Sequence, residues 1–471
     1  MTHGPERLQT DGHLEFTSAR GRWVLVATVL GSGLAMLDST VVNVALPFLG
    51  RELDAGMDGL QWTINAYTLT LAGLILLGGS LGDRYGRRRV FLVGTVWFAV
   101  ASALCGLAPN IEFLIAARAL QGIGGALLTP GSLAIIQASF VRGDRPRAVG
   151  AWSGLGGVAA AIGPLLGGWL VQTVGWRWAF LINLPFALLV VLVALRHVPE
   201  SRDEQAVGRF DVLGSVLAAL ALAGITYGLI QTGAAVPLIA GLALGVAFVA
   251  VEIRRSPDAL VPVGIFRNHV FTAVNVVTLI MYAAMGVVFF LLVVQLQVVS
   301  GFSPIAAGLA VLPATILMML LSARAGEVAK RYGPRWPMTI GILVAGAGFL
   351  WMSTIGFGAS YLLQVLPAVS VFGLGLSAAV APLTSTVLAT AEERYAGTAS
   401  GVNNAVARTG SLLAVAAVPP MVGLVGEAFR NPPVFDAGFR LAMLISAGMM
   451  VVSALITFLT IRTNVLAADG D

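Results

Sequence analysis

Long apolar runs separated by short polar segments recur along nearly the whole chain of 471 residues. Each run holds about 20 residues or more, the length that carries a helix across the hydrocarbon core of a bilayer at ~1.5 Å per residue. The pattern predicts fourteen membrane-spanning helices. They lie near residues 23–49, 61–81, 90–108, 112–138, 147–173, 177–196, 211–231, 236–252, 271–298, 304–325, 336–355, 361–388, 396–422 and 438–461.

The composition places the chain among integral membrane proteins. Of its residues, 57% are hydrophobic and 11% are charged, against about 25% charged residues in soluble domains. We expect an all-α fold with short cytoplasmic tails at 1–22 and 463–471. Between them we expect a six-helix bundle at 23–196, a linker with two extra transmembrane helices at 197–267, and a second six-helix bundle at 268–462.

The 28 lysine and arginine residues give a formal net charge of +5. They lie in short loops between apolar runs rather than in one patch, which argues against a nucleic-acid partner. Most fall on one side when the N-terminus is placed inside, so both termini are predicted to be cytoplasmic. The first apolar run is too long for a signal peptide. The single cysteine, Cys105, excludes a disulfide within the chain.

The densest charge lies in one of these loops, Gly79–Val90, between the second and third predicted helices. By charge alone, it is a basic cytoplasmic loop that fixes the orientation of the protein. Its spacing resembles the signature loop of the major facilitator superfamily, whose acid and bases form a latch that closes and opens with the transport cycle. The matching positions are Gly79, Asp83, Arg84, Gly86, Arg87 and Arg88.

A similar sequence recurs later in the chain. Residues 330–335 (Lys-Arg-Tyr-Gly-Pro-Arg) repeat the pattern of residues 83–88 (Asp-Arg-Tyr-Gly-Arg-Arg), and Gly326 falls opposite Gly79. If the middle pair of helices is an insertion, each loop follows the second helix of a six-helix bundle. Two such bundles around a midplane cavity form a transporter layout. We therefore expect a major facilitator fold with two extra central helices.

Asp38 is the only acid well inside a predicted span. A carboxylate at membrane depth costs roughly 2.5–3.5 kcal/mol and is a functional candidate by default, although it could also be a structural partner for an arginine. Burial favours its neutral form and a nearby guanidinium its charged form, so alternating exposure could load and unload a proton. Arg118 lies in the same outer half, and its segment, Leu114–Gly124, resembles the superfamily motif whose arginine is implicated in proton transfer.

The fifth predicted helix is rich in glycine. Small-residue packing is one explanation. The pattern also resembles the motif associated with antiporters of the superfamily, which implies export; its positions are Gly154, Gly163, Pro164, Gly167 and Gly168. Further segments resemble the fourteen-span drug:proton antiporters, namely Asp38–Pro47, Gln61–Trp62, Trp176–Trp178, Phe210–Asp211, Gly301–Pro304 and Gly401–Gly410.

Arg408 matches an arginine that recurs in that family, where glutamine often follows; here Thr409 follows. Two intramembrane arginines against one acid leave a surplus positive charge, which backbone carbonyls, water or a substrate could offset. With Arg408, we assign to a substrate cavity a set of polar side chains that could equally form interhelical hydrogen bonds. They are Asn43, Asn65, Gln121, Tyr282, Gln295 and Asn403.

The resemblance implies a proton-coupled exporter of lipophilic or amphipathic small molecules in a bacterial cell membrane. The alternative is a dedicated exporter of an endogenous metabolite such as an antibiotic or siderophore, and a membrane-embedded enzyme is a third class. We expect no catalytic or metal site, since the histidines lie in the tail or at span ends: His3, His13, His197 and His269. The only lysine, Lys330, precedes Arg331, so there is no phosphate-binding loop for ATP. We expect a monomer with no cofactor beyond the proton gradient.

Overall fold

The computed structural model describes residues 14–202, 211–231, 233–255, 261, 263–390 and 396–462. The tail residues 1–13 and 463–471, and parts of the predicted linker 197–267, lie outside these ranges. The first helices are α1 (Ala19–Glu52), α2 (Met57–Tyr85), α3 (Arg87–Gly106), α4 (Ile111–Ser139), α5 (Arg145–Thr173), α6 (Trp178–Leu181) and α7 (Asn183–His197). Two helices follow, α8 (Val212–Ile230) and α9 (Ala235–Arg255).

The remaining helices are α10 (His269–Val298), α11 (Pro304–Ala310), α12 (Leu312–Tyr332), α13 (Arg335–Met352), α14 (Leu366–Ala389), α15 (Ala396–Met421) and α16 (Pro432–Thr460). Short segments lie at η1 (Val263–Arg267), η2 (Tyr361–Val365) and η4 (Gly426–Arg430). Within the described residues, 12 helical segments are long and apolar enough to cross a membrane, with α6–α7 and α11–α12 each counted as one. α13 and α15 occupy the two other predicted positions, so the all-α membrane fold is confirmed.

Several helices begin where the sequence supplies a cap. The side chain of Asn110 accepts a hydrogen bond from the Phe113 N–H at 2.9 Å at the start of α4. Ser303 caps α11 and Asn431 caps α16, and each is followed by a proline in the first turn. A side-chain acceptor satisfies a free N–H, and proline is tolerated where no helical N–H is needed. Local chemistry therefore fixes these boundaries.

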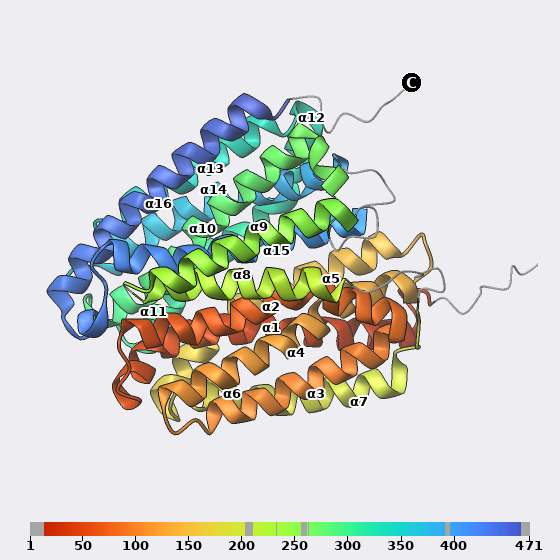
Figure 1. Cartoon of the computed structure of the whole chain (residues 1–471), viewed down its shortest axis with the longest axis horizontal. Helices are drawn as coiled ribbons and strands as arrows, with labels where there is room; N and C mark the ends of the chain where they lie inside the picture. The colour runs from red at the N-terminus through yellow and green to blue at the C-terminus, as the bar shows by residue number, and fades with distance from the viewer. Residues whose placement is uncertain are drawn as a thin grey trace, which may run out of the picture.

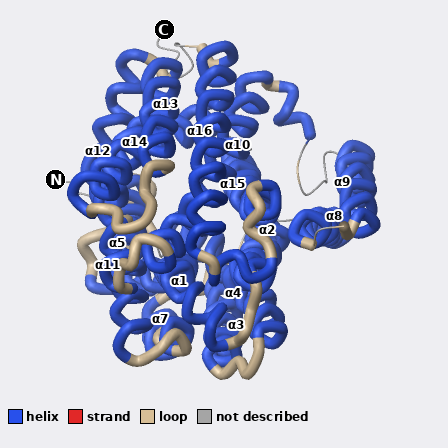
Figure 2. Tube along the Cα trace, turned by 90° about the vertical axis from the view of Figure 1, so that its left-hand side faces the viewer, coloured by secondary structure: helices blue, strands red, loops and turns tan. Residues whose placement is uncertain are grey.

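The helices form two sets with a pair at their side. α1 to α7 pack mainly among themselves, as do α10 and α12 to α16, while α11 packs chiefly against α5 and α15 also contacts α2. α8 and α9 pack against each other, and α8 also contacts α2 and α15; Figure 2 shows this pair beside the two sets. Figure 1 shows α13, α14 and α16 inclined to α1, α3 and α4, so the two sets diverge from one end of the molecule.

The echoed loops form equivalent turns in the two sets. Gly86 (φ 109°) separates α2 from α3, and Gly333 (φ 82°) separates α12 from α13. Both glycines have left-handed backbone conformations, which side chains with a Cβ rarely adopt. The repeat in the sequence therefore corresponds to a repeat in backbone geometry.

The two sets meet at the end that carries the α1–α2 turn, here named the outer end. Gln297 Nε2 of α10 donates to the Val44 carbonyl of α1 at 3.1 Å. Arg430 Nη2 donates to the Gly50 carbonyl at 3.1 Å and to Asp54 Oδ1 at 2.7 Å. The hydrogen bond to Asp54 raises the pKa of the Arg430 guanidinium above its ordinary value. These contacts close the molecule at its outer end.

Candidate functional site

Asp38 lies at the centre of a buried polar network. Its Oδ2 accepts a hydrogen bond from Arg118 Nη1 at 2.5 Å. Its Oδ1 accepts from Gln121 Nε2 at 2.8 Å and from Asn183 Nδ2 at 3.0 Å. The relative exposure of these four side chains is 1% or less. Both carboxylate oxygens are therefore satisfied without water, by residues of α4 and α7.

Arg118 is held on several sides. Its Nε donates to the Thr63 carbonyl at 3.0 Å, and its Nη1 also donates to Gln121 Oε1 at 2.6 Å. Its guanidinium carbon lies 4.4 Å from the centre of the Tyr67 ring. A buried ion pair is stable only when hydrogen bonds satisfy its remaining donors and acceptors. The structure thus brings together the two residues that the sequence assigns to proton coupling.

Two members of this network were missed by the sequence analysis. Asn183 begins α7, and its Nδ2 donates to both Asp38 Oδ1 and Ser102 Oγ. Ser102 of α3 also accepts from Gln121 Nε2 at 3.1 Å and donates to the Phe180 carbonyl at 2.9 Å. The available signal for Asn183 was an amide inside an apolar run, two residues before Pro185. That signal does not say which helix the amide faces.

The predicted latch lies at the opposite end from the α1–α2 turn. Asp83 Oδ1 pairs with Arg87 Nη2 at 2.8 Å within the turn. Glu200, which the sequence analysis did not single out, accepts from the Arg88 N–H at 3.0 Å and lies 3.8 Å from the Arg88 and Arg89 side chains. A Cβ on Gly86 would stand 2.7 Å from Glu200 Oε1. The turn therefore needs glycine for its backbone and for this acid.

The remaining predicted latch residues belong to α2. Arg84 lies in its last turn. A Cβ on Gly79 would stand 3.7 Å from Pro130 of α4, which is ordinary contact. The gating role of these residues stays a prediction.

The glycines predicted as an antiporter motif divide into two groups. At Gly163 a Cβ would overlap the Thr40 side chain of α1, and at Gly167 it would lie 2.9 Å from the Val41 Cα. At Gly168 it would lie 2.5 Å from the Pro304 carbonyl of α11. Nothing stands within 4 Å of a Cβ at Gly154. Near Pro164, then, α5 packs closely on both sets of helices, whereas at Gly154 there is open space.

Several residues assigned to a substrate cavity are committed to other contacts. Gln121 belongs to the Asp38 network. Gln295 Nε2 donates to the Ile355 carbonyl at 2.8 Å and to Asp436 Oδ1 at 2.7 Å. Asn403 Nδ2 donates to Thr278 Oγ1 at 2.9 Å and to Asn275 Oδ1 at 3.2 Å, which joins α15 to α10. Gln295 and Asn403 thus form the interhelical bonds that the sequence analysis left open.

The other cavity candidates are less engaged. Asn43 of α1 and Tyr282 of α10 are half-buried. Asn65 is fully buried, and neither its amide nitrogen nor its amide oxygen has a hydrogen-bond partner. Arg408 is half-buried on α15, and its buried Nε has no hydrogen-bond partner. Asn65 and Arg408 thus keep buried polar atoms without a hydrogen-bond partner among the described residues.

Gln61 forms a contact between the two sets that the sequence analysis did not foresee. Its Nε2 donates to the carbonyls of Val415 at 2.6 Å and Ala416 at 3.2 Å. In a helix these carbonyls would accept from residues 419 and 420, but both are proline and have no N–H. Gln61 of α2 therefore supplies, from the other set, the donor that α15 lacks.

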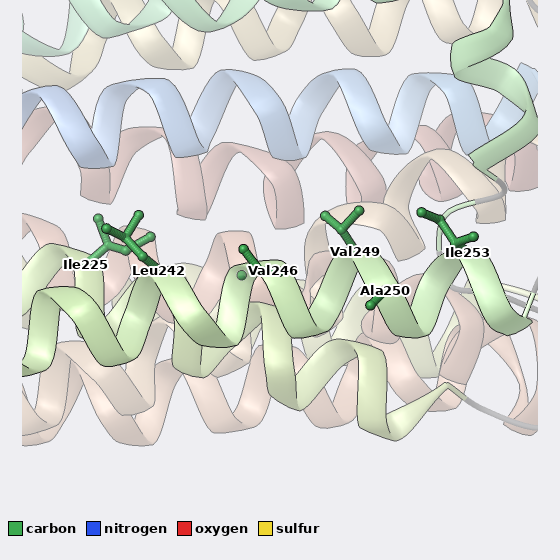
Figure 3. A pocket seen from close by; sticks show the side chains of 7 residues that line it. Ile225, Leu242, Val246, Val249, Ala250 and Ile253 are labelled. Carbon is green, nitrogen blue, oxygen red and sulfur yellow. The ribbon is translucent and has the colours of Figure 1, made fainter.

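Figure 3 shows an apolar groove away from these residues, along α8 and α9. It is lined by Ile225, Leu242, Gly245, Val246, Val249, Ala250 and Ile253. Val246 is 72% exposed, and an exposed apolar surface of this kind suits lipid acyl chains. Among the residues that the structure describes, no group of three or more His, Cys, Asp or Glu side chains could hold a metal ion.

The chain is similar in sequence and in fold to known transporters and resistance proteins. The sequence model of the Major Facilitator Superfamily matches residues 28–415. The chain is 34% identical over 434 residues to a tetracenomycin C resistance and export protein of Streptomyces glaucescens, covering 89% of this chain and 80% of the relative. It is 33% identical over 467 residues to a puromycin resistance protein of Streptomyces alboniger, covering 95% and 92%. A crystal structure of a POT family transporter with 5-aminolevulinic acid matches at a TM-score of 0.73, with 14% identity, covering 94% and 96%.

Proposed function

The chain belongs to the major facilitator superfamily, and we propose that it exports lipophilic or amphipathic small molecules across a bacterial cell membrane in exchange for protons. Its relatives include proteins named for resistance and export, which supports outward transport of drugs. The exchange with protons rests on Asp38. We place both termini in the cytoplasm, because the basic loops lie on that side.

The observation that carries the proposal is the sealed Asp38–Arg118 pair. In the outer-closed state described here, the carboxylate is held by three donors from two other helices. When a proton binds Asp38, the carboxylate becomes a neutral acid and loses most of its attraction for the guanidinium. Such a change of charge in a buried network alters the packing of α1 against α4 and α7.

The transport cycle follows from this change. The two sets rock about the midplane, as in other carriers built from repeated bundles. Opening the outer end breaks the ties of Gln61, Gln297 and Arg430 and gives Asp38 access to external protons. Closing it again and opening the inner end releases the proton to the cytoplasm and admits substrate there. We assign the gating role of the Asp83–Arg87 turn to the inner end, opposite the outer contacts.

The test is pH-driven efflux and substrate-dependent proton release from protein reconstituted in liposomes. Asp38→Asn keeps the size of the side chain and removes its proton chemistry, so we expect both signals to be lost while the protein still inserts. Glu112→Gln is the matched control, because Glu112 is an exposed acid at the start of α4. Unchanged efflux in Asp38→Asn would remove Asp38 as the coupling residue.

A dedicated exporter of an endogenous antibiotic is the second candidate. The relative named for tetracenomycin C resistance and export supports it. A panel of chemically diverse drugs, applied to cells that express the protein or its Asp38→Asn variant, separates the two. Protection against many drug classes indicates a multidrug exporter, and protection against a single class indicates a dedicated one.

A further inference from the structure

Arg408 lies at the middle of its helix. It is the thirteenth of the 26 residues of α15. On one side of it, seven residues away, Val415 accepts the hydrogen bond from Gln61 of α2. On the other side, also seven residues away, a Cβ on Gly401 would lie 2.8 Å from Leu76 of α2. Each interval is roughly 10 Å along the axis, so Arg408 is at midplane depth beside α2.

The guanidinium of Arg408 lacks an anionic partner. No ion pair reaches it within the part of the chain that the structure describes, and its buried Nε donates to nothing. Asp38, the one acid of the sequence well inside a span, already accepts from three donors. Arg118 shows the opposite arrangement, with its Nε and Nη1 engaged. Arg408 is therefore a membrane-embedded cation with unused donor capacity.

Two unpartnered polar groups lie on α2, the helix beside Arg408. The buried Tyr67 hydroxyl has no hydrogen-bond partner. Asn65 lies one turn from Gln61 on the same face of α2, so it also faces α15. Its two amide atoms are buried and unpartnered. Unsatisfied donors at this depth are costly unless a ligand or water completes them.

We infer that the exported substrate carries an anionic group, such as a carboxylate or a phenolate, and that Arg408 holds it at the midplane beside the unpartnered amide of Asn65. The inference rests on the proposed export function and names its substrate class. The planar guanidinium offers paired N–H donors that fit a carboxylate. The apolar remainder of the substrate packs against the helices around it.

Two probes of equal shape test this charge preference. Anthracene-2-carboxylate and anthracene-2-carboxamide are compared by equilibrium dialysis against the full-length protein in detergent, with protein-free micelles as the blank. We expect the wild type to bind the carboxylate about tenfold more tightly or better, since hydrogen bonds to charged groups are the stronger ones. Arg408→Gln should bring the ratio of affinities to about one, since the carboxylate loses its charged partner. Arg408→Lys should fall between, because it keeps the charge without the paired donors.

Arg254→Gln is the matched control, because it removes one exposed arginine at the end of α9 and should keep the wild-type ratio. Three results would overturn the inference: no binding of the carboxylate, equal binding of both probes by the wild type, or an unchanged ratio in Arg408→Gln (in Arg408→Lys, where the glutamine variant does not fold). The lysine variant decides the matter if the glutamine variant does not fold. Export driven by pH is measured on the same preparations. Its absence counts against the proposed function, and equal binding of the probes counts against this inference alone.

Discussion

Replacing Gln61 with leucine should shift the protein toward its outward-open state. In the outer-closed state, the Gln61 amide is 1% exposed and serves two carbonyls that Pro419 and Pro420 leave without helical donors. Leucine fills similar space and donates nothing. When the outer end opens, water hydrogen-bonds these carbonyls, so the substitution destabilises the open state little.

The size of the shift follows from the cost of a buried acceptor. An unsatisfied buried carbonyl costs about 1–3 kcal/mol. One amide nitrogen serves both carbonyls, so we take this range for the pair. A difference of 1–3 kcal/mol between two states changes their ratio by roughly 5–150-fold. A shift of this size converts a mostly closed population into a mostly open one.

Distances between spin labels at the outer end measure the shift. Val174 and Phe357 are 51% and 61% exposed, and they lie at the outer ends of α5 and of the α13–α14 connection. Cysteines at these positions can be labelled selectively, since Cys105 is fully buried. We expect Gln61→Leu to enrich the longer distance. Gln137→Leu, at an exposed glutamine of α4, should leave the distribution unchanged.

A second background tests the reason for the shift. Replacing both Pro419 and Pro420 by alanine restores the N–H groups that the two carbonyls lack. In that background Gln61→Leu should move the distance distribution much less than in the wild type. An equal shift in both backgrounds would refute the role of the prolines. No shift in either background would show that the Gln61 hydrogen bonds do not stabilise the closed state.

Three further substitutions have defined outcomes. Gly86→Ala forces a left-handed backbone at about 1–2 kcal/mol and displaces Glu200, so the melting temperature and the efflux rate should both fall. Gly163→Val should block α1–α5 packing and lower the yield of folded protein, while Gly154→Val, with open space around it, should fold normally. Asn183→Leu removes a donor to the buried carboxylate, a bond of about 1.5–3 kcal/mol, so proton release per substrate should fall roughly tenfold or more in liposomes.

The helices and their turns were predictable because their causes are local. Apolar runs of sufficient length, capping residues such as Asn110, and glycines at positions like Gly86 and Gly333 act within a few residues of themselves. The same holds for the candidate pair of Asp38 and Arg118. A charged residue inside a membrane span is energetically costly, so it can be recognised as a functional candidate from the sequence even when its partner is unknown.

The partners were not predictable, because tertiary packing decides them. Nothing near Asn183 in the sequence places it against Asp38, and nothing near Pro419 points to Gln61, more than 350 residues earlier. Gln295 and Asn403 illustrate the opposite error. They are amides in spans, as cavity residues would be, yet the fold commits both to interhelical bonds. An amide signals that a partner is needed and not which partner it finds.

The positions of the two arginines suggest how substrate and proton influence each other. Arg118 stacks on the ring of Tyr67 in α2, and Gln61 of the same helix donates to α15, the helix that carries Arg408. We therefore propose that α2 couples the Asp38–Arg118 pair to the cation at Arg408.

The charge of the substrate also sets the driving force. Exchange of a neutral molecule for one proton moves one charge, worth about 2.3 kcal/mol at 100 mV, which sustains roughly a fortyfold gradient. A monocation exchanged for one proton moves no net charge and draws only on the pH difference. A monoanion leaving as a proton enters moves two charges inward, about 4.6 kcal/mol at 100 mV, which sustains a gradient on the order of 2,000-fold. Under the proposal of an anionic substrate exchanged for a proton, Arg408 would bind the substrates on which the membrane potential does the most work.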